Sequence, residues 1–212
     1  MEFQHIYHTP IFARTLVSTD AIVVLSGRVV TIRGQVTSKE RENRSRIRFA
    51  ASLQQRIANA RQDSARRGHR RRAPQLYLVG TTEQVHDLGE IAVMVGCIGK
   101  PVTLDCGCIG QANTKTQFMA INAHLPSSTH HITIVTSRYH VPRVVRTADR
   151  WLPASMQFFV TGAPEGIKKI DIEGILLREF DRILEYGERD DLRVFPKRTG
   201  AALTKGQEPD YL

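Results

Sequence analysis

A repeated alternation of short apolar runs with stretches of helical periodicity is the sequence feature that most constrains the fold. The first run, Ala-Ile-Val-Val-Leu-Ser, follows Asp20 and ends at Gly27, and its apolar residues are continuous rather than alternating. A continuous run of this length is typical of a strand buried on both faces, as in a parallel sheet. Similar runs predict four further strands, at residues 75–80, 101–104, 131–137 and 156–160.

Helical patterns separate these runs. Thr37 and Glu40 have the spacing of a capping box, and the helix that they begin is predicted to end before Gly68. Pro142 suits the first position of a helix, where its missing N–H costs no hydrogen bond. Strands that alternate with helices in this way indicate one α/β domain with a mainly parallel sheet of about five strands. The remaining helices are predicted at residues 86–96, 113–125, 142–151 and 170–186.

The length and composition fit a single globular domain. The chain has 212 residues, of which 41% are apolar, so it can bury a core of ordinary size. No apolar run is as long as the roughly 18 residues that a spanning helix needs. The first residues lack the basic and apolar regions of a secretory leader, and three cysteines are too few for a disulfide framework. We expect a cytoplasmic protein with an N-terminal extension (1–19), a folded domain (20–187) and a C-terminal tail (188–212).

The net charge of +9 is concentrated in one segment. Residues 39–72 contain 12 Lys and Arg against three acidic residues, and the rest of the chain is neutral. The Arg-rich loop at 61–72 has no interleaved aromatic residues, so base stacking is unsupported and nucleic acid is the less favoured partner. The alternative to a small-molecule function is a non-enzymatic, envelope-associated or polyanion-binding regulatory module that uses residues 39–72.

In open parallel sheets, ligands bind beyond the carboxyl ends of the strands, where helix starts present free N–H groups. The densest polar set at such a position follows the strand at 131–137 and comprises Ser137, Tyr139, His140 and Arg143. A guanidinium, two hydroxyls and a helix start suit a phosphate or carboxylate, and an imidazole can act as acid or base near neutral pH. In the alternative interpretation, His140 caps the turn and Arg143 pairs with an acidic residue on the helix.

Two other groups of residues carry weaker chemical signals. Cys106 and Cys108 are separated by one residue, which is poor spacing for zinc, so we expect free thiols and no metal site. Asp105 and Glu90 could form a pair of carboxylates, but nothing in the sequence brings them together.

Several of these segments, in the same order, resemble the YdcF/SanA/ElyC-like family, a bacterial Rossmann-like domain of unknown function. The resemblance covers about residues 20–185, and its most specific part is the Thr-Ser-x-Tyr-His-x-x-Arg stretch from Thr136 to Arg143. It implies a Rossmann-like three-layer sandwich with a polar site at the strand ends. One branch of the family is reported to bind S-adenosylmethionine with no established reaction, and another is anchored to the membrane and linked to envelope integrity.

The resemblance also implies a set of site residues. His140 is the candidate acid or base, and the ligand-binding candidates are Gly27, Arg28, Arg46, Gly80, Thr81, Glu90, Asn113, Thr114, Thr136, Ser137, Tyr139 and Arg143. Arg46 is the best match for the family's arginine at a helix start, with Arg44 and Arg48 as close competitors.

The chain departs from the family pattern at two places. Val79-Gly80-Thr81 stands where the family has Ser-Gly-Gly, and Thr116-Gln117 stands where it has Glu-Asn. Losing one glycine restricts how closely the backbone can approach a ligand. The expected function is binding of a small anionic or nucleotide-like molecule, with S-adenosylmethionine as one candidate.

Overall fold

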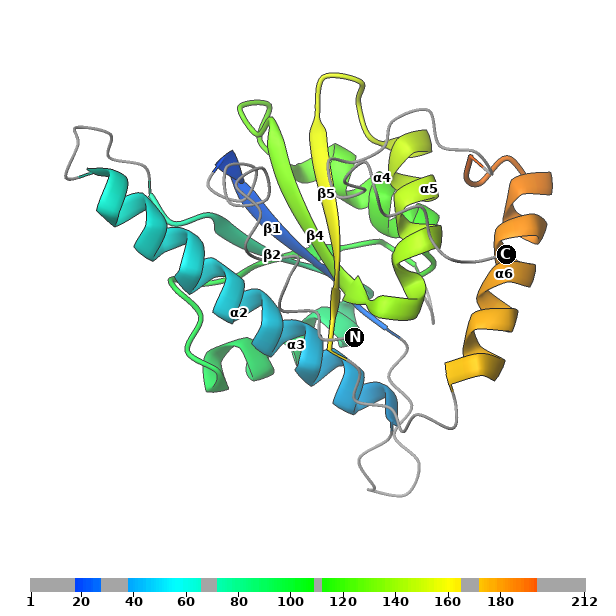
Figure 1. Cartoon of the computed structure of the whole chain (residues 1–212), viewed down its shortest axis with the longest axis horizontal. Coiled ribbons are helices and arrows are strands. Elements are labelled where there is room, and N and C mark those ends of the chain that lie inside the picture. Colours follow the sequence, from blue (N-terminus) through cyan, green and yellow to red (C-terminus); the bar gives the residue numbers. More distant parts are fainter. Residues whose placement is uncertain (1–17, 28–37, 66–71, 109–111, 165–171, 194–212) are drawn as a thin grey trace.

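The computed structural model places the five strands that it describes in one parallel sheet, in the order β3-β2-β1-β4-β5 (Figure 1). It describes residues 18–27, 38–65, 72–108, 112–164 and 172–193. The strands are β1 (Ala21–Leu25), β2 (Gln75–Gly80), β3 (Val102–Asp105), β4 (His131–Ser137) and β5 (Gln157–Ala163). The helices are α2 (Ser38–Ala65), α3 (Thr82–Met94), α4 (Thr114–His124), α5 (Val141–Trp151) and α6 (Ile172–Glu188). The predicted α/β architecture is confirmed, and the strand order is that of a Rossmann-like fold.

Helices cover both faces of the sheet, which gives three layers. On β1, Ile22 packs in the same cluster as Ile47 of α2, whereas Val23 packs with Phe118 of α4 and Val144 of α5. All five residues of β1 are buried, because a central strand of a parallel sheet has helices on each side of it. The continuous apolar run in the sequence therefore corresponds to a central position in the sheet.

Polar side chains on the inner face of α2 tie this long helix to the chain around it. Gln54 donates a hydrogen bond to the carbonyl oxygen of Pro74 at 2.9 Å. Arg61 is buried, and it donates to the carbonyl oxygen of Thr19 just before β1. One arginine of the basic segment is therefore buried and stabilises the fold, and it does not contribute to the charged surface.

Several element boundaries differ from the predictions, including the end of β5 at Ala163 rather than at residue 160, and two of the differences have a local reason. The helix α3 begins at Thr82 rather than near residue 86, because Thr81 and Gln84 form a capping box at its start. A single 3-10 turn, η2 (Arg138–His140), separates β4 from α5, and Pro142 lies in the first turn of α5 as predicted. The predicted N-cap Thr37 and residues 66–71 of the basic loop lie outside the described residues.

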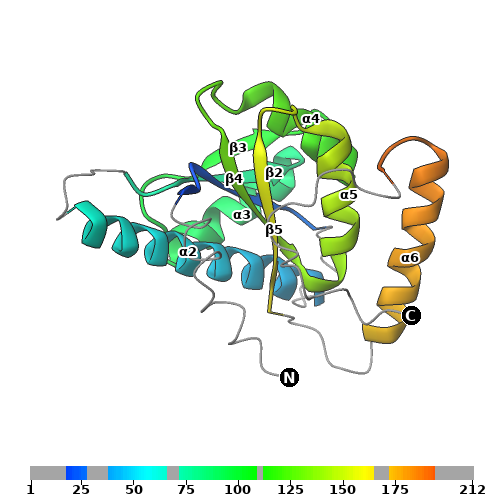
Figure 2. The same ribbon diagram turned by 45° about the horizontal axis from the view of Figure 1, so that its top comes forward.

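The last described residues dock against α4 and α5 (Figure 2). Lys115 Nζ lies 2.6 Å from Asp191 Oδ1, and the indole N–H of Trp151 donates to the carbonyl oxygen of Asp191 at 2.8 Å. Leu192 is buried, and Asp190 forms an ion pair with α5. The C-terminal tail is predicted to span residues 188–212. Its first residues instead pack on the domain and hold α6 beside it.

Gly80 and Gly89 offer a matched test of the packing at the strand ends. A Cβ on Gly80 would overlap Ser26 Oγ and lie 2.8 Å from Gln84 Oε1, whereas a Cβ on Gly89 would meet nothing within 4 Å. We expect Gly80→Ala to lower the free energy of unfolding by about 1–3 kcal/mol through overpacking. Gly89→Ala should raise it by about 0.5–1 kcal/mol, because alanine has the higher helix propensity. Chemical denaturation measures both, and a shift of the same sign in the two variants would contradict the packing at Gly80.

Candidate functional site

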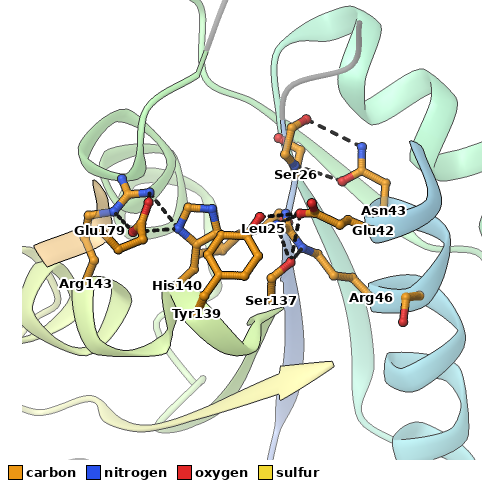
Figure 3. A network of polar contacts seen from close by, with 12 residues as sticks. Leu25, Ser26, Glu42, Asn43, Arg46, Ser137, Tyr139, His140, Arg143 and Glu179 are labelled. Atoms are coloured by element: carbon orange, nitrogen blue, oxygen red, sulfur yellow. Dashed lines mark hydrogen bonds and ion pairs between the residues drawn. The ribbon is translucent and has the colours of Figure 1, made fainter. Parts of the chain in front are cut away.

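The carboxyl ends of β1 and β4 lie side by side at a topological switch point. From β1 the chain continues through α2 to β2, whereas β4, on the other side of β1, is followed by α5. Since α2 and α5 cover opposite faces of the sheet, the two strand ends lead into different layers. Open α/β sheets bind their ligands at such points. Gly27 follows β1 here. Ser137 at the end of β4, and Tyr139 and His140 after it, lie at the same point (Figure 3).

Arg46, on α2, connects the two strand ends (Figure 3). Its Nη1 donates to the carbonyl oxygen of Leu25 at 2.8 Å, and its Nε and Nη2 donate to Ser137 Oγ at 3.0 and 2.8 Å. Glu42, one turn earlier on α2, lies 3.4 Å from Nη2. The side chain is 2% exposed, and each guanidinium nitrogen has a hydrogen-bond partner. The charge of Arg46 is therefore balanced by groups inside the protein and does not face solvent.

Two hydroxyl groups at the end of β4 donate hydrogen bonds to Glu42. Its Oε2 accepts hydrogen bonds from Ser137 Oγ at 3.1 Å and from the Tyr139 hydroxyl at 2.5 Å. Burial raises the pKa of Tyr139 well above its usual range, and the hydrogen bond to the Glu42 carboxylate raises it further. Tyr139 is therefore a neutral donor that is held in place at neutral pH.

A second set of hydrogen bonds, made of uncharged groups, surrounds the end of β1. Ser26 Oγ donates to Gln84 Oε1 at 2.8 Å and accepts from Gln117 Nε2 at 2.9 Å. Gln84 Nε2 donates to the carbonyl oxygen of Gly27 at 3.1 Å, and the N–H of Gly27 donates to Asn43 Oδ1 at 2.9 Å. These amides come from α2, α3 and α4, so three helices fix the path of the chain after β1.

A second arginine–carboxylate pair lies beyond η2. Arg143 Nε donates to Glu179 Oε2 at 2.8 Å, and its Nη1 donates to Thr114 Oγ1 at 2.9 Å. Arg182 donates to the other carboxylate oxygen, Glu179 Oε1, at 2.7 Å. Arg143 therefore links α5 to α4 and α6, and the acid with which it pairs belongs to α6 rather than to its own helix.

His140 lies between the two arginine–carboxylate pairs (Figure 3). Its Nδ1 is 2.7 Å from Arg143 Nη2 and 3.0 Å from Glu179 Oε2, and its ring centroid is 4.3 Å from that of Tyr139. Its other ring nitrogen, Nε2, faces away from Arg143 and Glu179 and has no hydrogen-bond partner among the residues that the structure describes. The side chain is 18% exposed, so a molecule from solvent can reach it.

The surroundings of His140 hold it neutral. Burial lowers the pKa of His140 to about 4; the hydrogen bond with Glu179 opposes this shift, and the charge of Arg143 adds to it. Burial alone would raise the pKa of Glu179, but its contacts with His140 and Arg143 outweigh burial and lower that pKa to about 2. At neutral pH the cluster therefore contains a carboxylate, a guanidinium and an uncharged imidazole.

Several predicted ligand-binding residues have structural tasks in this region. Thr81 and Asn113 are the N-caps of α3 and α4, and Thr136 is buried within β4. Glu90 is not brought to the site, because it is exposed on α3, where its nearest charged neighbour is His86 of the same helix. Arg28 lies outside the described residues. Gly27, Arg46, Gly80, Thr114, Ser137, Tyr139, His140 and Arg143 do gather around the switch point.

Sequence reasoning missed the acids and amides that hold these residues. Glu42 precedes Arg46 by one helical turn, a spacing that indicates an ion pair. Glu179 stands among the apolar residues of the last predicted helix, where an acid on the buried face signals a partner in the core. The capping-box spacing marks Gln84 as a residue of a helix start. No pattern marks the contacts of Gln84 and Gln117 with Ser26, because these residues are 58 and 91 positions from it.

The cysteines considered for a metal site and the acids considered for a carboxylate pair make other contacts in the structure. Cys108 Sγ donates to the carbonyl oxygen of Cys106 at 3.4 Å, and burial raises the pKa of Cys106 to about 12. Asp105 accepts from Thr82 rather than facing Glu90. Within the described ranges, no group of three or more His, Cys, Asp or Glu could hold a metal ion, and no helix combines the length and apolar character needed to cross a membrane.

Comparison of the chain with protein-family models, with curated proteins and with solved structures found no match. The fold and the switch-point site define the class of protein, which is a Rossmann-like α/β domain. The resemblance to the YdcF/SanA/ElyC-like family stays a prediction.

Arg46 and Arg48 give a matched test of the buried network. Arg46→Met should lower the free energy of unfolding by roughly 3–5 kcal/mol, because it leaves the buried Glu42 carboxylate without its counter-charge and the Leu25 carbonyl without the Arg46 donor. Arg48→Met, two residues along the same helix at an exposed position, should change it by no more than about 0.5 kcal/mol. Urea denaturation of both variants checks this, and similar small effects would show that Arg46 is not an anchor.

The low pKa of His140 predicts acid sensitivity. Its unfolded-state value is near 6.5 and its folded value is about 4, so the unfolded chain binds the proton first and stability is lost as pH falls from 6.5 toward 4. Between pH 7.5 and 4.5 the free energy of unfolding should fall by about 2–3 kcal/mol from this group. His140→Gln should remove this part of the pH dependence, whereas His130→Gln, at an exposed position, should retain it. Equal pH profiles for the two variants would contradict the prediction.

Proposed function

We propose that this protein binds a small anionic or nucleotide-like molecule at the carboxyl ends of β1 and β4, with His140 as its central contact. The observation that carries the proposal is the imidazole itself: Nδ1 is held by Arg143 and Glu179, while Nε2 has no partner within the described residues. The side chain is 18% exposed, so a ligand at the switch point could reach this nitrogen and supply a partner.

The charges around His140 favour an anion. Arg46 and Glu42 neutralise one another within the network. Arg143 and Arg182 share the single carboxylate of Glu179, which leaves one positive charge beside the imidazole. The start of α5 has no side-chain cap, so its positive dipole end acts in the same direction.

The fold class supports the nucleotide-like part of the proposal. Rossmann-like sheets place nucleotides over the switch point, and the side chains there are already fixed by hydrogen bonds, which reduces the entropy cost of binding. S-adenosylmethionine is the first cofactor to test, because the resemblance suggests it and because it combines a nucleoside with a carboxylate. The acid–base role that the sequence predicts for His140 stays a prediction and is not part of this proposal.

The alternative function, polyanion binding by residues 39–72, is less favoured. Arg46 and Arg61 are buried and bonded to the chain, so two of the bases in this segment do not face solvent. Arg48, Arg56 and Arg72 are exposed. Salt-dependent binding to RNA or anionic vesicles that persists in His140→Gln would favour the alternative.

The ligand can be sought without knowing its identity. Mass spectrometry of the native protein should detect a small molecule that copurifies, and a thermal-shift screen of nucleotides, S-adenosylmethionine and inorganic phosphate should identify its class. A ligand present at 100 times its Kd stabilises the folded state by about 2.7 kcal/mol, which such a screen resolves.

Two histidine variants test where the ligand binds. His140→Gln should weaken binding of the best hit by roughly 3- to 10-fold, the effect of one hydrogen bond. His86→Gln is the control, because His86 is exposed on α3 and its only charged neighbours are acids of the same helix. Unchanged affinity in His140→Gln, measured by calorimetry, would place the ligand elsewhere and contradict the proposal.

A further inference from the structure

Two groups converge on one nitrogen of His140. Arg143 Nη2 lies 2.7 Å from Nδ1, and Glu179 Oε2 lies 3.0 Å from the same atom. A guanidinium can only donate and a carboxylate can only accept. Nδ1 of a neutral ring either carries a proton, which suits Glu179, or offers a lone pair, which suits Arg143. The two contacts therefore require different tautomers.

The contact with Arg143 is the shorter of the two, which favours a lone pair on Nδ1. Arginine keeps its protons in proteins, and a hydrogen on Arg143 Nη2 is directed at Nδ1. A hydrogen on Nδ1 would compete with the Arg143 donor at this 2.7 Å contact, so a lone pair on Nδ1 fits it better. The opposite arrangement brings a lone pair to 3.0 Å from Glu179 Oε2, which is sterically allowed. The charge on that carboxylate is offset by Arg143 Nε at 2.8 Å and Arg182 Nη1 at 2.7 Å.

We propose that Arg143 holds His140 as the tautomer with its proton on Nε2, so that the ring presents a fixed, uncharged hydrogen-bond donor to an oxyanion of the bound molecule. This inference rests on the proposed function and names the chemistry that the site recognises: a phosphate or carboxylate oxygen. Glu179 is a positioning residue, because it orients Arg143 and does not itself face the ligand.

The groups around the ring agree with this assignment. Arg143 from α5 and Arg182 from α6 are cations, and Tyr139 is a neutral neighbour. Among the side chains that the structure describes, Glu179 from α6 is the one anion that contacts the ring. The low pKa of His140 keeps the ring uncharged at neutral pH. An uncharged donor can stabilise negative charge on an oxygen without transferring its proton. On this account His140 binds and polarises, rather than acting as the acid or base that the sequence predicts.

The tautomer can be observed directly in the intact protein. Two-bond ¹H–¹⁵N correlation spectra of the ¹⁵N-labelled chain distinguish protonated from unprotonated ring nitrogens. His124 provides an internal reference, because its Nδ1 lies 3.0 Å from the Ala120 carbonyl oxygen, which can only accept, and so must carry the proton. We expect His140 to show the opposite pattern, with an unprotonated Nδ1. A His140 spectrum of the same type as that of His124 would overturn the proposal.

Two substitutions identify the residue that sets the tautomer. Arg143→Met should shift His140 to the Nδ1-protonated form and raise its pKa, because Glu179 then faces the ring without competition. Glu179→Gln should keep the Nε2-protonated form, because Arg143 still donates to Nδ1. If Arg143→Met does not fold, Glu179→Gln decides alone: an Nδ1-protonated ring in that variant would mean that Arg143 does not by itself fix the tautomer, contrary to the proposal.

Titration with three probes tests the recognised group. Inorganic phosphate and AMP should move the Nε2 signal of His140 and leave that of His124 in place, whereas adenosine, which lacks the phosphate, should not move it. A shift with adenosine alone, or no shift with phosphate and AMP, would overturn the assignment to an oxyanion. In that case a thermal-shift hit that is weakened by His140→Gln would still support the proposed function, so the two failures are distinguishable.

Discussion

Arg46 is the group on which the arrangement of the strand ends depends. Moving a guanidinium out of water costs several kcal/mol, and the cost is offset only when its donors find good acceptors. Here those acceptors are the Leu25 carbonyl at the end of β1, the Ser137 hydroxyl at the end of β4 and the Glu42 carboxylate on α2. The position of each element is therefore constrained by the other two, and the rotation of α2 about its axis is set by a polar contact as well as by its apolar face.

The site consists of charged pairs that support uncharged groups. Glu42 and Arg46 fix Tyr139, and Glu179 and Arg143 fix His140. Because each arginine is largely neutralised by its own carboxylate, what the protein presents at the switch point is hydrogen-bonding geometry together with a modest positive potential. Selectivity of this kind depends on donor placement, and a misplaced donor is costly because the buried network cannot readjust around it.

Much of the fold could be predicted because its signals are local. The continuous apolar runs, the proline at residue 142 and the helical periodicities each depend on a few neighbouring residues, and these elements are present in the structure. The cluster from Ser137 to Arg143 was predicted because it is dense in the sequence. Glu179 was not, because its partners Arg143 and His140 are 36 and 39 residues away, and only the docking of α6 brings them together. Glu90 is the opposite case: the family resemblance implies a role for it, whereas the structure places it at an exposed position on α3.

The carboxylate that orients the site belongs to α6, the last helix, and not to an element that connects two strands of the sheet. Opening of α6 would remove Glu179 and Arg182 together and leave Arg143 without its counter-ion. If a ligand binds at the switch point as proposed, and binds best when Glu179 holds Arg143, its occupancy and the closure of this helix are thermodynamically linked, and the coupling free energy is the same whichever event occurs first. Such a ligand would slow amide exchange in α6, and the last helix would then report on the state of the site.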